Sequence, residues 1–225
     1  DVDLVMGTFS KSFGSLGGVI AGPKEVIEWI KHKARAMVFQ ASMTPASVAA
    51  ALASLDIIQK EPERRERLWR IANKMRTAFR MLGYDTGVSD GPVVPVFIGD
   101  QIKCFRLWKA LYENGVFANP VIPPAVEPGM SLMRTSYMSI HTDEQLDRVI
   151  EQFEILGKKF KVIPEDAPVA ADVISKVGSV DDPNAEAPRF VASSYQPRPA
   201  ANGMGSRTTA DIAKRVFDLV ETATW

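Results

Sequence analysis

Residues 7–18 read GTFSKSFGSLGG, and this stretch decides how the rest of the chain is interpreted. It places one lysine, Lys11, among hydroxyl side chains and glycines. The apolar runs on either side, residues 2–6 and 18–22, suit buried strands. Glycine allows the backbone to turn tightly and to pass close to a ligand. The stretch therefore predicts a lysine-bearing loop between two strands.

Three kinds of site are compatible with a lysine in such a loop. A phosphate-binding P-loop requires glycine directly before the lysine and again five residues earlier, but Ser10 and Val5 occupy these positions. A surface lysine in a polar turn is favoured by the spacing alone. The third kind is a Schiff-base lysine: burial disfavours the ammonium, and the neutral amine of Lys11 can attack the aldehyde of pyridoxal phosphate (PLP). Thr8 can then offer its hydroxyl to the cofactor phosphate.

The same stretch resembles the cofactor-lysine segment of the α-oxoamine synthases, fold-type I PLP enzymes that condense an amino acid with an acyl-CoA and release CO₂. Later segments resemble the same family in order and spacing, from residue 1 to about residue 160. These segments are FQASMTP at 39–45, NPV at 119–121, PPAV at 123–126 and RTSYMSIHT at 134–142. The sequences of these segments are most similar to those of bacterial serine palmitoyltransferases. The resemblance implies an α/β fold, the C-terminal part of a fold-type I PLP-dependent transferase.

The resemblance also implies roles for individual residues. Lys11 would carry the cofactor covalently and act as a general base, and Thr8 would contact the cofactor phosphate. Ser42 lies in a segment that would reach the phosphate of the partner subunit's cofactor. Arg134 would bind the carboxylate of the amino-acid substrate, which suits a planar guanidinium. No metal is implied.

The activity implied by the resemblance is a decarboxylative condensation of serine with a long-chain acyl-CoA, giving a product of the 3-ketosphinganine type. A glycine C-acetyltransferase and an enzyme like 8-amino-7-oxononanoate synthase are the alternatives. A non-catalytic partner subunit is an alternative of another class. The family is expected to form homodimers with shared active sites. Its ring-binding aspartate and histidine precede the lysine in the chain, so residues 1–225 alone are expected to be inactive.

Composition sets outer limits on function. Lys plus Arg equals Asp plus Glu, 27 each in 225 residues, so no long-range attraction to nucleic acid is expected. The single cysteine, Cys104, cannot form an internal disulfide and suits the cytosol. No apolar run approaches the roughly 20 residues that a membrane-spanning helix needs. We therefore expect a cytoplasmic protein, or one peripheral to a membrane.

The spacing of apolar residues, together with the prolines and glycines that end helices and strands, divides the chain into four parts. Residues 1–85 are predicted to be the end of the PLP-binding large domain with connecting helices, and 86–161 a small C-terminal α+β domain. In that domain we expect strands at 93–98, 116–118 and 133–139, and helices at 101–114 and from Thr142, where Gln145 completes a capping box. Residues 162–207, rich in proline, are predicted to be a flexible linker or tail, and 208–225 a truncated helix.

Overall fold

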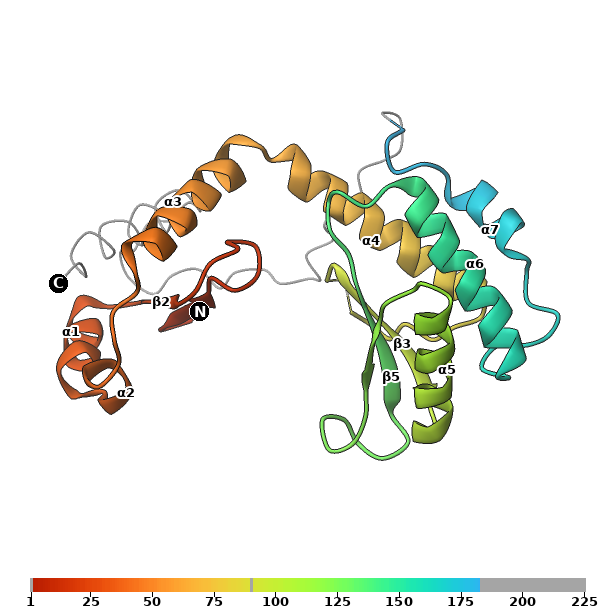
Figure 1. Cartoon of the computed structure of the whole chain (residues 1–225), viewed down its shortest axis with the longest axis horizontal. Helices are drawn as coiled ribbons and strands as arrows, with labels where there is room; N and C mark the ends of the chain where they lie inside the picture. Colours follow the sequence, from red (N-terminus) through yellow and green to blue (C-terminus); the bar gives the residue numbers. More distant parts are fainter. Residues whose placement is uncertain (1, 90, 183–225) are drawn as a thin grey trace, which may run out of the picture. The chain divides into compact units, whose positions relative to one another are not determined.

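The structure, a computed structural model, describes residues 2–89 and 91–182. The described residues form two compact units, which divide between Glu61 and Pro62 (Figure 1). The predicted division at residue 85 stays a prediction. The helix that precedes this residue packs on the second unit in the structure.

The first unit contains a two-stranded sheet and three helices. Strand β1 (Val5–Thr8) pairs antiparallel with β2 (Gly18–Ala21), with Val5 opposite Ala21 and Thr8 opposite Gly18. The helices are α1 (Lys24–Lys33), α2 (Arg35–Val38) and α3 (Pro45–Lys60). The pairing places residues 9–17 in one loop that joins the two strands, as the sequence predicts.

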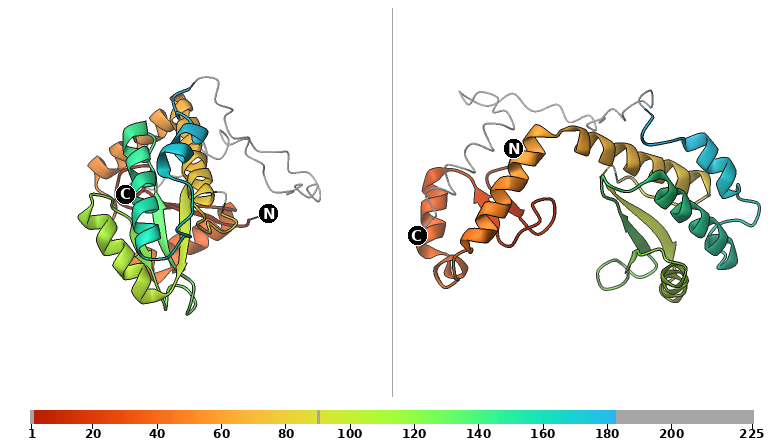
Figure 2. Two further views of the ribbon diagram at one scale, coloured as in Figure 1. Left: turned by 90° about the vertical axis from the view of Figure 1, so that its right-hand side faces the viewer. Right: turned by 45° about the horizontal axis from the view of Figure 1, so that its top comes forward.

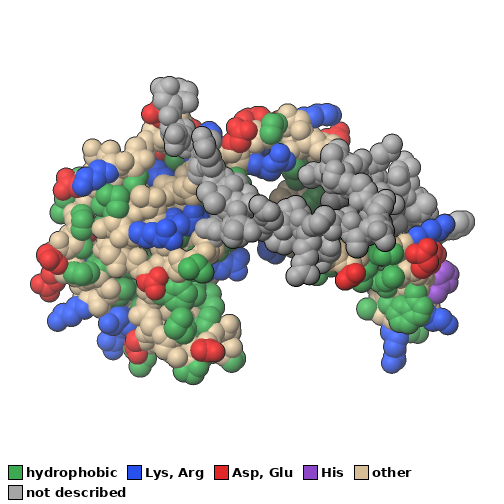
Figure 3. All heavy atoms as spheres, turned by 180° about the vertical axis from the view of Figure 1, so that it is seen from behind, with side chains coloured by type: hydrophobic (Ala, Val, Ile, Leu, Met, Phe, Trp, Pro, Cys, Tyr) green, Lys and Arg blue, Asp and Glu red, His purple; other side chains and the backbone are tan. Residues whose placement is uncertain are grey.

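The prediction that both strands are buried is wrong for the described residues. Val5 is 50% exposed, Met6 is 69% exposed and Ile20 is 43% exposed. Each strand has one neighbour in a sheet of two strands, so neither is enclosed as in a wide parallel sheet. Figure 3 shows hydrophobic side chains at the surface of this unit, beside charged ones.

Local sequence signals set the ends of α3. The side chain of Thr44 accepts a hydrogen bond from the amide of Ser47, and Pro45 occupies the first helical position. The helix ends at Lys60, just before the Glu61–Pro62 pair, because proline cannot continue the hydrogen-bonding pattern of the residues that precede it. Both ends of α3 are thus set by residues within a few positions of the helix termini.

The second unit is a three-stranded antiparallel sheet packed with helices (Figures 1 and 2). The strands lie in the order β3 (Val93–Gly99), β5 (Ser131–Ser136) and β4 (Asn119–Val121). The helices are α4 (Glu63–Met81), α5 (Gln101–Glu113), α6 (Asp143–Lys159) and α7 (Ala170–Val177). The capping box predicted at the start of α6 is confirmed: Thr142 and Gln145 exchange both bonds.

An aromatic cluster lies at the centre of this unit's core. Phe79 and Phe153 are fully buried, with ring centroids 4.7 Å apart, and Tyr84 packs edge-on against both. The Tyr84 hydroxyl donates to the carbonyl of Phe153 at 2.7 Å, so its polar atom is satisfied. The same hydroxyl occupies the place where a side chain at Gly157 would begin. Burial raises the pKa of Tyr84 well above its ordinary value.

The strand predicted at residues 116–118 is absent, and β4 begins at Asn119 instead. The amide of Val116 donates to the carbonyl of Leu111, and the amide of Gly115 to that of Tyr112, which closes the end of α5. Val116 is buried as part of this helix cap. Residues 116–118 are apolar and therefore resemble a strand in the sequence. In the structure, the amide of Val116 instead bonds to the end of α5.

The structure differs from the predicted linker over residues 162–182. Helix α7 lies here and packs on α4 and α6 (Figure 2). Its Val173 is fully buried, and Ile163 and Val180 on either side of it join the same core. The helix has eight residues, too few for a clear apolar period, and prolines flank it. The predicted helix at 208–225 and the remainder of the predicted linker, residues 183–207, lie outside the described residues.

Candidate functional site

Three backbone hydrogen bonds close the loop between β1 and β2. The amide of Phe9 donates to Gly17 at 2.9 Å, and the amide of Ser15 donates back to Phe9 at 2.8 Å. Within the loop, the amide of Gly14 donates to the carbonyl of Lys11 at 2.9 Å. The backbone that carries Lys11 is thus held by its own loop.

The Lys11 amine and two hydroxyls form a connected chain at the surface of this loop. The amine donates to the hydroxyl oxygen of Ser10 at 3.1 Å, and the Ser10 and Thr8 hydroxyls lie 3.0 Å apart. Beneath them, the ring of buried Phe9 packs on that of Phe13, with centroids 5.1 Å apart. The aromatic residues on either side of Lys11 anchor the loop, and the polar groups face outward.

The expected burial of Lys11 is wrong for the described residues, because the lysine, Thr8 and Ser10 are all exposed. The loop caps a sheet of only two strands, so little of the first unit can cover it. Ser10 is the residue that sequence reasoning missed. Its position beside the lysine was visible, but its contact with Thr8 depends on the turn that the backbone makes at the end of β1.

Close packing explains two glycines of the motif. Gly17 has φ +93°, a conformation that other residues rarely adopt, and a Cβ at this position would displace the side chain of Met43. A Cβ on Gly18 would meet the carbonyl oxygen of Gly7 at 2.5 Å, because Gly18 lies opposite Thr8, the residue that follows Gly7 in β1. Both glycines therefore allow close approach, as the sequence indicates.

Ser42 lies in the same unit, two residues before the N-cap of α3, and is exposed. An open hollow lies between the lysine loop and the start of this helix. The hollow is lined by Ser10, Gly14, Ser15, Leu16, Ala46, Ser47 and Ala50. The side chain of Thr44 caps this helix, which gives the residue a structural role.

Arg134 lies in the second unit, in the central strand β5, between Pro95 and Asn119 of the neighbouring strands. Along β5, Met133 and Thr135 are buried while Arg134 is exposed. Because side chains alternate across a strand, the guanidinium lies on the sheet face opposite Met133 and Thr135. Lys11 and Arg134 thus belong to different units.

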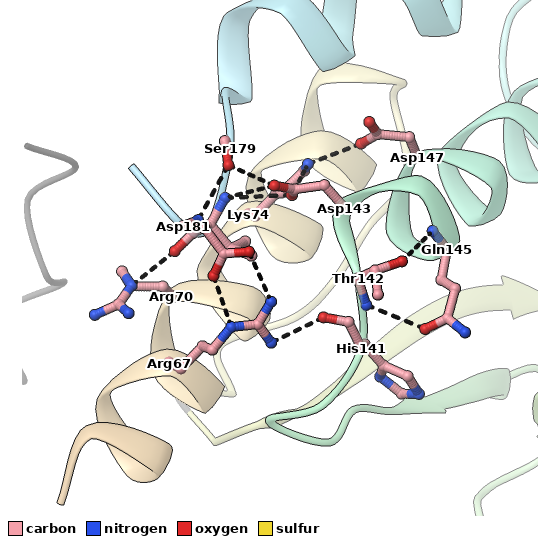
Figure 4. A network of polar contacts seen from close by, with 11 residues as sticks. Arg67, Arg70, Lys74, His141, Thr142, Asp143, Gln145, Asp147, Ser179 and Asp181 are labelled. Atoms are coloured by element: carbon pink, nitrogen blue, oxygen red, sulfur yellow. Dashed lines mark hydrogen bonds and ion pairs between the residues drawn. The ribbon is translucent and has the colours of Figure 1, made fainter. Parts of the chain in front are cut away.

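A network of charged side chains holds the loop that follows β5 (Figure 4). The Arg67 guanidinium donates to the carbonyls of Ser139 and His141 and to both carboxylate oxygens of Asp181. His141 accepts a hydrogen bond at Nδ1 from the amide of Met138, 3.1 Å away. These contacts give His141 a structural role. Its pKa is lowered, first by burial and then by the charge of Arg67.

Lys74 is the buried centre of this network. Its side chain is 4% exposed, and its amine lies 2.7 Å from a carboxylate oxygen of Asp143 and 2.7 Å from one of Asp147. Asp143 also accepts hydrogen bonds from the hydroxyl of Ser179 and the amide of Val180. The turn after α7 is therefore fixed to α4 and α6 by charged groups.

Two other kinds of site find no support in residues 2–89 and 91–182. No group of His, Cys, Asp and Glu side chains there could hold a metal ion. No helix in the same ranges is both long and apolar enough to cross a bilayer. Cys104 is buried, which raises the pKa of its thiol to about 11, so it is a core residue rather than a nucleophile.

Comparison with known proteins extends these observations. The chain is 46% identical over 163 residues to a serine palmitoyltransferase of Bacteroides ovatus, covering 72% of this chain and 41% of the relative. It is 41% identical over 162 residues to an 8-amino-7-oxononanoate synthase of Fervidobacterium nodosum, covering 72% and 41%. Two solved structures, the serine palmitoyltransferase of Sphingomonas wittichii and an SPT with PLP, each align with a TM-score of 0.68 and 34% identity. Each alignment covers 72% of this chain and 41% of the solved chain.

The chain spans about two fifths of the length of these relatives, 41% in each case. The solved structures support the α/β architecture of a fold-type I PLP transferase over the matched part. The family model of the class I and II aminotransferases matches residues 1–153, which include the lysine loop and all three strands of the second unit. The chain therefore belongs to the aminotransferase class I and II family.

Proposed function

We propose that Lys11 binds PLP covalently in an acyltransferase of the α-oxoamine synthase type, which condenses serine with a long-chain acyl-CoA. The observation that carries this proposal is the chain of polar atoms from Lys11 through Ser10 to Thr8, with steps of 3.1 and 3.0 Å. A lone surface lysine in a polar turn would not need hydroxyls aligned on its amine. The relatives named serine palmitoyltransferase support the choice of substrates.

The residues present fit the cofactor. A primary amine suits an aldehyde, and hydroxyls suit a phosphate group because they donate hydrogen bonds to its oxygens. Gly14 has φ +58°, and no atom lies within 4 Å of the place where its Cβ would be, so space remains beside the loop. We assign the phosphate contact to Thr8 and, from the partner subunit of a homodimer, to Ser42. When bound, PLP supplies an electron sink for the negative charge that develops on the substrate's α-carbon.

The chain's own residues then have distinct tasks. Arg134 binds the substrate carboxylate in a two-pronged grip and so orients the α-carbon. The free amine of Lys11 would remove the α-proton of the bound amino acid as a general base. The overall reaction would join the α-carbon to the acyl group of the thioester and release CoA and CO₂. Lys11 is thus both the covalent anchor and the general base.

A product assay tests this proposal in the protein expressed with any further residues that its gene encodes. Serine with palmitoyl-CoA should give CoA release and a long-chain amino ketone, whereas glycine with acetyl-CoA should give little product. Replacing Lys11→Ala should abolish turnover. Normal condensation by this variant would contradict the proposal, and preference for glycine and acetyl-CoA would support the alternative of a glycine C-acetyltransferase.

A non-catalytic partner subunit is the alternative of another class. The lysine and the two hydroxyls beside it favour the catalytic role, since a subunit without cofactor has no need for them. Borohydride reduction of the protein with PLP should attach the cofactor to the peptide that carries Lys11. Absence of that labelled peptide would favour the non-catalytic role. We propose that the protein is cytoplasmic or peripheral to a membrane, since its single cysteine suits a reducing compartment.

A further inference from the structure

Two hydroxyl groups fasten the lysine loop to helix α3. The hydroxyl of Ser54 donates to the carbonyl of Phe13 at 2.8 Å, and the hydroxyl of Ser15 donates to the carbonyl of Ser47 at 2.7 Å. One donor lies on the helix and the other on the loop, so the two bonds run in opposite directions. Both are partly buried, which shields them from competition with water.

The Ser54 bond reaches the loop close to the lysine. Phe13 is the second residue after Lys11, and its ring packs on that of buried Phe9, the second residue before Lys11. The carbonyl of Lys11 accepts the amide of Gly14, which follows Phe13 directly. A displacement of the Phe13 carbonyl therefore changes the turn that presents the lysine.

We infer that Ser54 is a positioning residue for Lys11. Its hydroxyl fixes the Phe13 carbonyl and with it the backbone turn, so that the Lys11 amine stays at hydrogen-bond distance from Ser10. This inference rests on the proposed function, in which Lys11 reacts with the PLP aldehyde. It adds a residue that lies 41 positions from Phe13 in sequence and acts without touching the cofactor.

The order of the backbone matters at this position because the side chain of Lys11 is exposed. A flexible amine loses conformational entropy when it forms a covalent bond, and the loss is smaller where its backbone is already ordered. Removing one partly buried hydrogen bond should weaken PLP binding by about tenfold. The Thr8 and Ser10 hydroxyls would remain, but the Lys11 amine would lie within hydrogen-bond distance of Ser10 for a smaller fraction of the time.

The test compares Ser54→Ala with Ser54→Thr, which retains the hydroxyl, in the protein expressed with all residues that its gene encodes. The control is Thr77→Ala, which removes an exposed hydroxyl from α4 in the other unit. Amide hydrogen exchange of residues 9–17 is measured without PLP. Titration with PLP, followed by the absorbance of the lysine adduct, then gives the dissociation constant. Thermal unfolding shows whether each variant is folded.

In Ser54→Ala the loop amides should exchange several-fold faster, and the PLP dissociation constant should rise about tenfold. Ser54→Thr and Thr77→Ala should match the unchanged protein in both measurements. If Ser54→Ala does not fold, Ser54→Cys, which keeps the size but donates weakly, takes its place and should show the same two changes.

Two results would overturn the inference and separate it from the proposed function. Unchanged exchange, or faster exchange with unchanged PLP affinity, would show that Ser54 does not position Lys11 although the protein binds PLP. An unchanged protein that takes up no PLP would instead overturn the proposed function, and the inference with it.

Discussion

Arg67 and Asp181 form a two-pronged ion pair across 114 positions of sequence: Nε lies 2.8 Å from one carboxylate oxygen and Nη2 lies 3.1 Å from the other. Arg67 also donates to the carbonyls of Ser139 and His141 in the loop that follows β5 (Figure 4). Asp181 lies beyond residues 1–153, the part that the family model matches. A segment outside the family match is thus joined to the loop that follows the strand of Arg134.

Replacing Arg67→Ala should lower the free energy of unfolding by about 2 kcal/mol, because it removes donors from two carbonyls and from Asp181. Most of this loss comes from the carbonyls, since Asp181 is largely exposed and its charge is screened. Urea unfolding measures the change. Lys176→Ala, an exposed cation on α7, is the control and should change stability little. Equal effects of the two variants would contradict this account.

The stability of the second unit should fall in acid because of Asp143. Burial raises the pKa of its carboxyl, but hydrogen bonds from Lys74, Ser179 and the Val180 amide outweigh burial, so the folded-state pKa is below the ordinary value. Ionised Asp143 therefore stabilises the fold above the unfolded pKa of about 4, and this contribution is lost as the pH falls through the lower folded-state pKa.

Asp143→Asn is the variant that checks this pH dependence. It should be less stable at pH 7, and its stability should decline less steeply than that of the unchanged protein as the pH falls below about 4. Denaturant unfolding at a series of pH values measures both. Asp166→Asn, an exposed carboxylate near α7, should keep the original slope. An unaltered slope in Asp143→Asn would refute the assignment.

Gly157→Ala should destabilise the second unit by about 2 kcal/mol, because its new methyl group would overlap the Tyr84 hydroxyl in the core. The displaced hydroxyl would also lose its bond to the Phe153 carbonyl. Adding Tyr84→Phe should recover part of the loss in the Gly157→Ala background, whereas alone it should cost about 1 kcal/mol. A double-mutant cycle by urea unfolding tests this coupling, and strict additivity would contradict the contact.

Arg134→Lys should raise the KM for the amino acid roughly tenfold to a hundredfold, with a smaller change in kcat, if the guanidinium grips the carboxylate in two places. Lysine retains the charge but not the planar fork. Steady-state kinetics with serine and with palmitoyl-CoA varied in turn measures the effect. The KM for palmitoyl-CoA should stay nearly constant, and a change confined to that substrate would place Arg134 elsewhere in the mechanism.

The sequence by itself determined the features that depend on neighbours a few residues apart. The lysine loop between two strands, the Thr44 and Thr142 caps and the break at Pro62 follow from side chains that bond to nearby backbone, or from a missing amide. The family resemblance was likewise present in ordered segments of residues 1–160.

Only the tertiary structure decided which distant residues meet. The bonds of Ser54 with Phe13 and of Arg67 with Asp181 span 41 and 114 positions, and no local period or spacing records them. The packing of α7 was missed for the same reason, since its eight residues are buried by helices far away in sequence. Exposure of Lys11 also depends on how many strands surround its loop, which is a property of the assembled sheet.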